Sequence, residues 1–468
     1  RSIRLRGLEG EEIPVQIHDV QQTTTAIALA SGPRGVLDVY RVRASFRAVL
    51  PSMGYTTCFL KTDLNPNRWK AAAKPPNIIE NEYLRVVVNP NGTFDMTART
   101  GDWQETFAGL GLFIDSGDNG DGYTFSPPPF NRVVSSVGAH PRIAKVGTGV
   151  CLQQLRIEYD FELPIGLDDA RQRRRDETIV CPITVDLILR EGSQRLEIAV
   201  TIDNRVKDHR LQMRFPTGFR GVTQASSAMQ FDVVTRAVNP EPITPGDWWV
   251  EDPPDTFPMH GWMDVSAADA SSGLCVIAHG LHEFAVAAHD ESADVSLTLL
   301  RAVGYLGARR DPTTIIGGAG PGIPTPEAQL QQTLHYRIAL YPHSGAWASA
   351  DVWQQAHEFL NPPRVVTSVP HSGEHDPRQR GLQISGDNVV LSSLKQSEDG
   401  QALIIRLYNP SLEVATATLT LPIDIATAHT ATLQEQILEV LRIEEQRRLK
   451  CDIPAKTIMT LHIQPKSM

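Results

Sequence analysis

The sequence predicts an all-β fold, and three observations indicate it. Apolar residues recur in short runs that alternate with polar residues, which is the period of a half-buried strand. These runs are rich in branched residues and end at Gly, Pro, Asn or Asp. No strand–helix alternation and no phosphate-binding glycine motif occur, which disfavours nucleotide-binding α/β folds. The clearest runs lie at 83–88, 184–189, 196–202, 295–300, 403–408 and 416–421.

Local signals refine this prediction in chain order. Asn91-Gly92 stands between two strand patterns and predicts a hairpin whose two turn residues both take positive φ. One helix is expected after Ser349, its predicted cap, and the proline pair that follows Asn361 ends it. A second, shorter helix is expected within 433–445.

Breaks in these patterns divide the chain into three predicted units. Residues 1–72 form a small N-terminal β domain, and residues 73–366 form a large β unit. The large unit is too long for one immunoglobulin-like sandwich, so we expect a larger two-sheet sandwich. A polar, Pro-rich linker at 370–377 precedes a C-terminal β-sandwich at 378–468.

Composition narrows the classes of function. The net charge of −10 argues against a nucleic-acid binder, which needs a basic surplus. The one basic run, 171–175, has acidic neighbours and is interpreted as a solvated loop. The five cysteines form no CxxC pair and fit a reducing, cytoplasmic setting. No apolar stretch is long enough for a membrane span, and the start at Arg1, without methionine, is interpreted as the start of a fragment.

The stretch GDNGDGYTF, residues 117–125, allows three interpretations. A calcium loop fails, because glycine stands where oxygen ligands are needed whether Asp115 or Asp118 begins the loop. Catalytic carboxylates of a glycosidase normally face each other across a cleft, whereas Asp118 and Asp121 share one tight loop. The third interpretation is a glycine-shaped turn whose Asp side chains accept nearby backbone N–H groups, which leaves Tyr123 projecting at a fixed angle.

No metal site and no nucleophile are predicted within the chain. Among fourteen histidines, His282 and His357 each precede a glutamate, but no second histidine follows at the zincin spacing. The sequence contains neither a His-x-Asp pair nor a GxSxG motif. The chain therefore shows no catalytic constellation of its own.

Eight segments along the chain share the order and the residue pattern of one known family. They are ENEYLRVVVNPNGTFDMTARTG (80–101), FIDSGDNGDGYTFSPP (113–128), DNRVKDHRLQMRFP (203–216), FPMHGWMDVS (257–266), GLCVIAHGLHEFAV (273–286), LTLLRAVGYL (297–306), GGAGPGIPTPEAQ (317–329) and LSSLKQSEDGQALIIRLYNP (391–410). In this order they resemble the C-terminal half of the glycoside hydrolase family 38 α-mannosidases. The bacterial branch of the family, which includes mannosylglycerate hydrolases, is most similar.

The resemblance implies a galactose-mutarotase-like supersandwich and a catalytic half that lies outside this chain. That half would carry zinc and both catalytic aspartates of a retaining mannosidase, so no cofactor is expected here. In family members, a tyrosine in the acidic loop bonds the bound sugar, and Tyr123 is the matching position. An arginine of the LTLLRAVG strand lines the pocket, and Arg301 matches it best. His209 and Arg210 are interpreted as structural. The chain departs from the family pattern at 307–312.

The resemblance implies two partners. One is an α-mannoside or mannosylglycerate-like carbohydrate, and the other is the catalytic domain of the same protein. Formation of a homo-oligomer is left as an open alternative. Two alternatives remain. One is a non-catalytic carbohydrate-binding protein, for which Trp248-Trp249 is the sequence support. The other is a structural or dimerising unit without carbohydrate binding.

Overall fold

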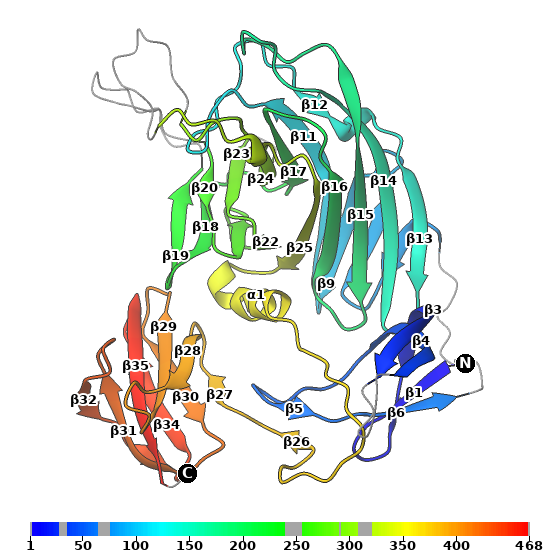
Figure 1. Cartoon of the computed structure of the whole chain (residues 1–468). Helices are drawn as coiled ribbons and strands as arrows, with labels where there is room; N and C mark the ends of the chain where they lie inside the picture. The colour runs from blue at the N-terminus through cyan, green and yellow to red at the C-terminus, as the bar shows by residue number, and fades with distance from the viewer. Residues whose placement is uncertain are drawn as a thin grey trace.

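The computed structural model describes residues 2–27, 35–63, 75–238, 255–289, 292–307 and 321–466. Strands dominate these residues (Figure 1), so the predicted all-β class is confirmed. One α-helix, α1 (Val352–Leu360), occurs in the described ranges, with three short 3₁₀ turns. The 3₁₀ turns are η1 (Ser136–Gly138), η2 (Pro326–Gln329) and η3 (Trp347–Ser349). No helix among the described residues is long and apolar enough to cross a membrane.

The large sandwich packs a nine-stranded sheet against a six-stranded and a four-stranded sheet around one apolar core. In order, the nine strands are β13 (Arg142–Thr148), β14 (Leu152–Pro164), β15 (Thr178–Arg190), β16 (Leu196–Asp203), β25 (Thr333–His343), β22 (Gly273–His279), β21 (Trp262–Ser266), β18 (Gln224–Met229) and β19 (Asp232–Ala237). The six are β12 (Val134–Ser135), β11 (Leu112–Gly117), β17 (His209–Pro216), β24 (Ala293–Ala302), β23 (Glu283–Ala288) and β20 (Phe257–Pro258). The four are β10 (Trp103–Leu110), β9 (Phe94–Thr100), β8 (Leu84–Val88) and β7 (Ile78–Glu80).

The period-two pattern explains how these strands build the core. Along β14, Leu155, Ile157 and Tyr159 point inward and are buried, while the residues between them are partly exposed. Successive side chains of a strand point to opposite faces of its sheet, so one face becomes apolar. Burying each such side chain contributes about 1.5–3 kcal/mol. The core therefore supplies a rigid frame for the loops at the strand ends.

The hairpin predicted at Asn91-Gly92 is present, but its turn differs from the expectation. A five-residue loop joins β8 to β9, and of the two residues only Gly92 has positive φ, at 83°. Asn91 uses its side chain instead, because its Oδ1 accepts the Thr93 N–H at 3.2 Å and the Thr93 hydroxyl at 2.8 Å. An Asn that bonds the backbone two residues on can form the turn without positive φ of its own.

Gly92→Ala is expected to destabilise the protein by about 2–4 kcal/mol. A Cβ at Gly92 would lie 2.1 Å from the buried Tyr159 hydroxyl oxygen, in addition to the strain of positive φ. Gly101→Ala is the matched control, because its φ is also positive but no atom lies within 4 Å. We expect the control to cost about 1 kcal/mol in urea unfolding. Equal decreases in the free energy of unfolding for the two variants would show that the clash between the new Cβ and the Tyr159 hydroxyl contributes nothing.

Both helix predictions are tested by the structure. The helix expected after Ser349 exists as α1, but it begins two residues later, after Asp351. Ser349 lies in η3 and donates its hydroxyl to the Ala346 carbonyl at 3.1 Å, so its predicted capping role is wrong. The second helix is also wrong, because β32 (Ile437–Val440) and β33 (Ile443–Glu444) occupy that segment. Pairing with neighbouring strands overrides the local helical preference there.

The C-terminal sandwich consists of a four-stranded and a five-stranded sheet with their own core. The four strands are β27 (Gln383–Ser385), β30 (Ala415–Thr420), β34 (Arg448–Ile453) and β33. The five are β28 (Val390–Gln396), β29 (Leu403–Asn409), β35 (Thr457–Pro465), β31 (Ile425–Ala431) and β32. Figure 1 shows α1 between this unit and the large sandwich. Trp353 of α1 packs edge-on against Tyr408 of β29, with ring centroids 5.8 Å apart.

The N-terminal strands form small sheets. A three-stranded sheet contains β2 (Glu12–Ile13), β1 (Ser2–Arg6) and β6 (Phe59–Asp63), and a hairpin contains β3 (Val15–Ile27) and β4 (Gly35–Phe46). The short β5 (Tyr55–Thr56) pairs with β26 (Arg378–Gln379), so the N-terminal part of the chain contacts the segment that directly follows the linker (Figure 1). The first predicted boundary, at 72, lies outside the described residues, and the three domain ranges stay predictions.

Candidate functional site

Three strand ends bring the predicted site residues to one end of the six-stranded sheet. β11 ends at Gly117, where the acidic loop begins, and its partner β17 begins at His209. β24, on the other side of β17, ends at Ala302. The antiparallel register places Arg301 opposite Arg210, and Arg210 opposite Ser116. The loop that carries Tyr123 and the strand that carries Arg301 are therefore neighbours in space.

The acidic loop is a turn built by its own aspartates, as the third interpretation predicted. Asp118 Oδ1 accepts the Gly120 N–H at 2.9 Å and the Ser126 N–H at 3.3 Å. Asp121 Oδ1 accepts the Tyr123 N–H at 2.9 Å and the Thr124 N–H at 3.0 Å. Both aspartates are buried. One carboxylate oxygen of each aspartate accepts backbone N–H groups of the loop, and Tyr123 is left 54% exposed.

Arg301 holds this loop on the sheet. Its Nε donates to Asp118 Oδ2 at 2.9 Å, and its Nη2 donates to the Asp121 carbonyl oxygen at 2.9 Å. Asp118 is fully buried and the Arg301 side chain is mostly buried, so this pair is little screened by water. The structure therefore brings Arg301 and the Tyr123 loop together. A sugar contact by Tyr123 or Arg301 stays a prediction.

Asp115 takes no part in the turn and instead lies at the centre of a buried network. One of its carboxylate oxygens accepts from Arg174 Nη2, and the other lies 2.6 Å from His209 Nδ1. His209 Nε2 in turn lies 3.1 Å from Asn204 Oδ1. Asp115, Arg174 and His209 are each at most 3% exposed. The network fixes the end of β11, from which the loop starts, and the structural role predicted for His209 agrees with it.

The interpretation of 171–175 as a solvated loop is wrong for Arg174. Its guanidinium enters the protein, where Nη1 also donates to the Arg132 carbonyl at 3.0 Å. Arg173 is solvated as expected, whereas Arg175 is partly buried and its Nε donates to the Leu167 carbonyl at 3.0 Å. A charge count along the sequence missed this difference because the partner, Asp115, lies 59 residues away. A usable signal was present, since Asp115 alternates in phase with the buried Phe113.

Arg210 packs its guanidinium on Phe125, the last residue of the loop stretch. The guanidinium carbon lies 3.4 Å from the ring centroid, and Arg210 is only 8% exposed. Burial lowers the pKa of Arg210, while the carboxylates of Asp255, Glu283 and Asp118 oppose this shift. Its Nε and Nη1 have no hydrogen-bond partner in the described part of the chain. The stacking contact therefore anchors the far end of the loop.

Two residues that sequence reasoning missed complete this end of the sheet. Arg171 Nε donates to Asn119 Oδ1 in the acidic loop at 2.7 Å, and its guanidinium lies over the ring of Tyr305, 6.0 Å from the centroid. The Tyr305 carbonyl accepts the Gly122 N–H at 3.1 Å. Tyr305 is 40% exposed. A second exposed tyrosine therefore lies next to the residue that precedes Tyr123.

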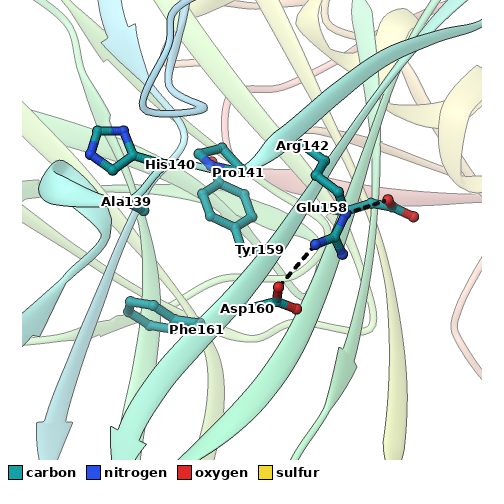
Figure 2. Close-up of a pocket in the computed structure, with 8 residues that line it drawn as sticks. All are labelled: Ala139, His140, Pro141, Arg142, Glu158, Tyr159, Asp160 and Phe161. Atoms are coloured by element: carbon teal, nitrogen blue, oxygen red, sulfur yellow. Dashed lines mark hydrogen bonds and ion pairs between the residues drawn. The ribbon is translucent and has the colours of Figure 1, made fainter.

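A small pocket elsewhere on the large sandwich does not contain these residues. It has a volume of about 100 Å³ and is lined by residues 139–142 and 158–161. Figure 2 shows Arg142 turned toward Glu158 and Asp160, and its Nη1 lies 2.9 Å from Asp160 Oδ2. All three side chains are exposed, and the one guanidinium faces two carboxylates. The pocket is therefore a small, solvated and slightly acidic hollow away from the loop of Tyr123.

The remaining sequence predictions concern metal ligands and two further segments. No group of three or more His, Cys, Asp or Glu side chains in the described ranges could hold a metal ion. Trp248-Trp249 and residues 308–312, where the chain departs from the family pattern, lie outside the described residues.

Two family models match the chain. The Glycosyl hydrolases family 38 C-terminal domain matches residues 79–312, which is half of the chain. The family 38 C-terminal beta sandwich domain matches residues 388–466. A protein of Halalkalibacterium halodurans, provisionally named a mannosylglycerate hydrolase, is 26% identical over 403 residues. The match covers 83% of this chain and 42% of that protein.

Solved structures share the fold. The crystal structure of an alpha-mannosidase from Enterococcus faecalis V583 matches with a TM-score of 0.81 at 21% identity, over 99% of this chain and 51% of that one. A family 38 protein from Enterococcus faecalis matches with a TM-score of 0.80 at 20% identity, over 99% and 52%. The chain thus spans about half the length of these relatives. From the two matched family models, the chain belongs to glycoside hydrolase family 38 and carries its C-terminal β domains.

Proposed function

We propose that this chain is the C-terminal region of an α-mannosidase-type retaining glycoside hydrolase. In this proposal it completes the sugar-binding cleft of a zinc-dependent catalytic domain that lies outside the chain. The substrate is an α-mannoside or a mannosylglycerate-like carbohydrate. The observation that carries the proposal is the rigidity of the acidic loop. Hydrogen bonds of Arg301, Asp118 and Asp121 hold the loop in place, while the Tyr123 side chain remains exposed.

The described residues at this end of the sheet fit neither a zinc site nor a pair of free catalytic carboxylates. Asp118 is committed to Arg301 and to backbone N–H groups, and Asp115 is committed to Arg174 and His209. The remaining function of this end of the sheet is binding. Tyr123 can donate its hydroxyl to a sugar oxygen, and the rigid loop fixes where that donor lies before the substrate arrives. We therefore assign zinc and the bond-breaking groups to the other domain.

The test is hydrolysis of an aryl α-mannoside, with added zinc, by this chain and by the product of the full reading frame. We expect turnover only by the full product. In that product, Tyr123→Phe should lower kcat/KM by about two- to tenfold, because one hydrogen bond to a neutral group is lost. Tyr40→Phe, on the distant β4, is the matched control and should leave kcat/KM unchanged.

Other outcomes point elsewhere. If the full product binds mannosides without hydrolysing them, the carbohydrate-binding alternative is supported. If it neither binds nor hydrolyses them, a structural role replaces the proposal.

A further inference from the structure

Tyr305 lies beside Tyr123 through a direct backbone contact. The Gly122 N–H is shared between the carbonyl oxygens of Tyr305 and Leu306, each at 3.1 Å. Gly122 immediately precedes Tyr123, so the segments that carry the two tyrosines touch at this point. Both tyrosines are exposed, Tyr123 at 54% and Tyr305 at 40%. Two aromatic side chains therefore meet solvent at the same end of the six-stranded sheet.

The backbone around Tyr305 is as well supported as the acidic loop. Tyr305 forms an antiparallel bridge with Pro324, which lies on a segment that returns alongside it. The Leu306 N–H donates to the Ile323 carbonyl at 2.9 Å, and the Thr325 N–H donates to the Gly304 carbonyl at 2.8 Å. These bonds continue the direction of β24 beyond Ala302. The ring of Tyr305 is thus carried by a short ladder rather than by an unsupported loop.

Arg171 fixes the ring of Tyr305 relative to the acidic loop. Its Nε donates to Asn119 in that loop, and its Nη1 lies 3.2 Å from Asp208 Oδ1. With both contacts made, its guanidinium lies over Tyr305 at 6.0 Å from the ring centroid. Arg171 pairs with Asp208, and its Nη2 is buried without a hydrogen-bond partner in the described part of the chain. The group that meets solvent here is therefore the supported ring of Tyr305.

We propose that Tyr305 is a specificity-determining residue that stacks on the part of the substrate beyond the sugar bound by Tyr123. The inference rests on the proposed function, and it narrows the substrate class. An aromatic ring favours a partner with an apolar C–H face, such as a second pyranose ring. A short charged group such as glycerate has no such face, and among the described residues Arg171 is already paired with Asp208. The intact enzyme should therefore prefer a mannoside whose leaving group is another sugar.

The test compares three substrates with the full-length enzyme: an aryl α-mannoside, an α-linked mannobiose and mannosylglycerate. Tyr305→Ala should raise KM for mannobiose by about three- to tenfold and change kcat by less than twofold. The KM for mannosylglycerate should not change. Tyr305→Phe should behave like the wild type, because stacking needs the ring and not the hydroxyl. Tyr40→Ala is the control for loss of an exposed tyrosine.

The outcomes separate this inference from the proposed function. Wild-type turnover with an unchanged mannobiose KM in Tyr305→Ala overturns the inference alone, as does an equal rise in KM for mannosylglycerate. If the wild type shows no turnover, saturation-transfer NMR with mannobiose decides. If the wild type binds mannobiose and Tyr305→Ala binds it more weakly, the hydrolase proposal is overturned, but the proposed contact between Tyr305 and the sugar is supported. No binding by the wild type overturns both.

Discussion

Replacing Asp115 with alanine is expected to lower the free energy of unfolding by about 3–5 kcal/mol, the cost of breaking a buried ion pair from one side. The substitution leaves the Arg174 guanidinium buried without its carboxylate, and it removes the partner of His209 Nδ1. Water cannot replace the lost acceptor, because Arg174 and His209 are almost completely buried. We expect the urea midpoint to fall strongly, and the Tyr123 loop to lose its fixed start at the end of β11.

Asp160→Ala is the matched control for this experiment. Asp160 also pairs with an arginine, Arg142, at 2.9 Å, but both side chains are more than half exposed. Exposed pairs of this kind contribute about 0–1 kcal/mol. Asp115→Asn should fall between the two, because it keeps an acceptor but removes the charge. A loss from Asp115→Ala as small as that from Asp160→Ala would contradict the assignment of a central role to this network.

Arg301→Met is expected to lower the free energy of unfolding by about 2–4 kcal/mol. The fully buried Asp118 loses its charged partner, and the Asp121 carbonyl loses a donor. In the full-length enzyme, we expect kcat/KM for an aryl α-mannoside to fall by about tenfold to a hundredfold, because small displacements of positioned groups are costly. Chemical denaturation and steady-state kinetics measure the two effects separately.

Two further variants distinguish charge from geometry. Arg301→Lys keeps the charge but cannot reach both Asp118 and the Asp121 carbonyl with a planar fork, so it should recover only part of the stability. Adding Asp118→Asn to Arg301→Met removes the stranded carboxylate and should be less destabilising than the sum of the single changes. Strict additivity would contradict the ion pair. Arg142→Met, at an exposed pair, is the control for loss of an arginine.

The sequence was sufficient for the fold class and for the nature of the acidic loop. Alternation with period two is a local property, and the predicted runs at 184–189 and 196–202 lie within the core strands β15 and β16. The turn interpretation of 117–125 also depended on local chemistry, because Asp118 and Asp121 bond N–H groups within eight residues of themselves. The resemblance to family 38, carried by ordered segments, led to the same end of the molecule.

The features that the sequence did not predict share a physical cause. Each depends on contacts with residues that are distant in sequence. Arg301 meets Asp118 across 183 positions, so its part in holding the loop could not be read from its own segment. Tyr305 stands in a short stretch whose exposure depends on the strand that returns at Pro324. The segment at 437–444 has a helical local preference, yet its strands are decided by β31 and β34.

The pairing of β5 with β26 has a consequence for biosynthesis. The Tyr55 hydroxyl donates to the Asp376 carbonyl at 2.8 Å, across 321 positions of the chain. At about 5–20 residues per second, a ribosome needs about 16–65 s to make that stretch. During this time β5 has no strand to pair with, because β26 has not yet been made. Slower translation lengthens that interval, so codon usage between these strands should influence how much of the protein is recovered folded.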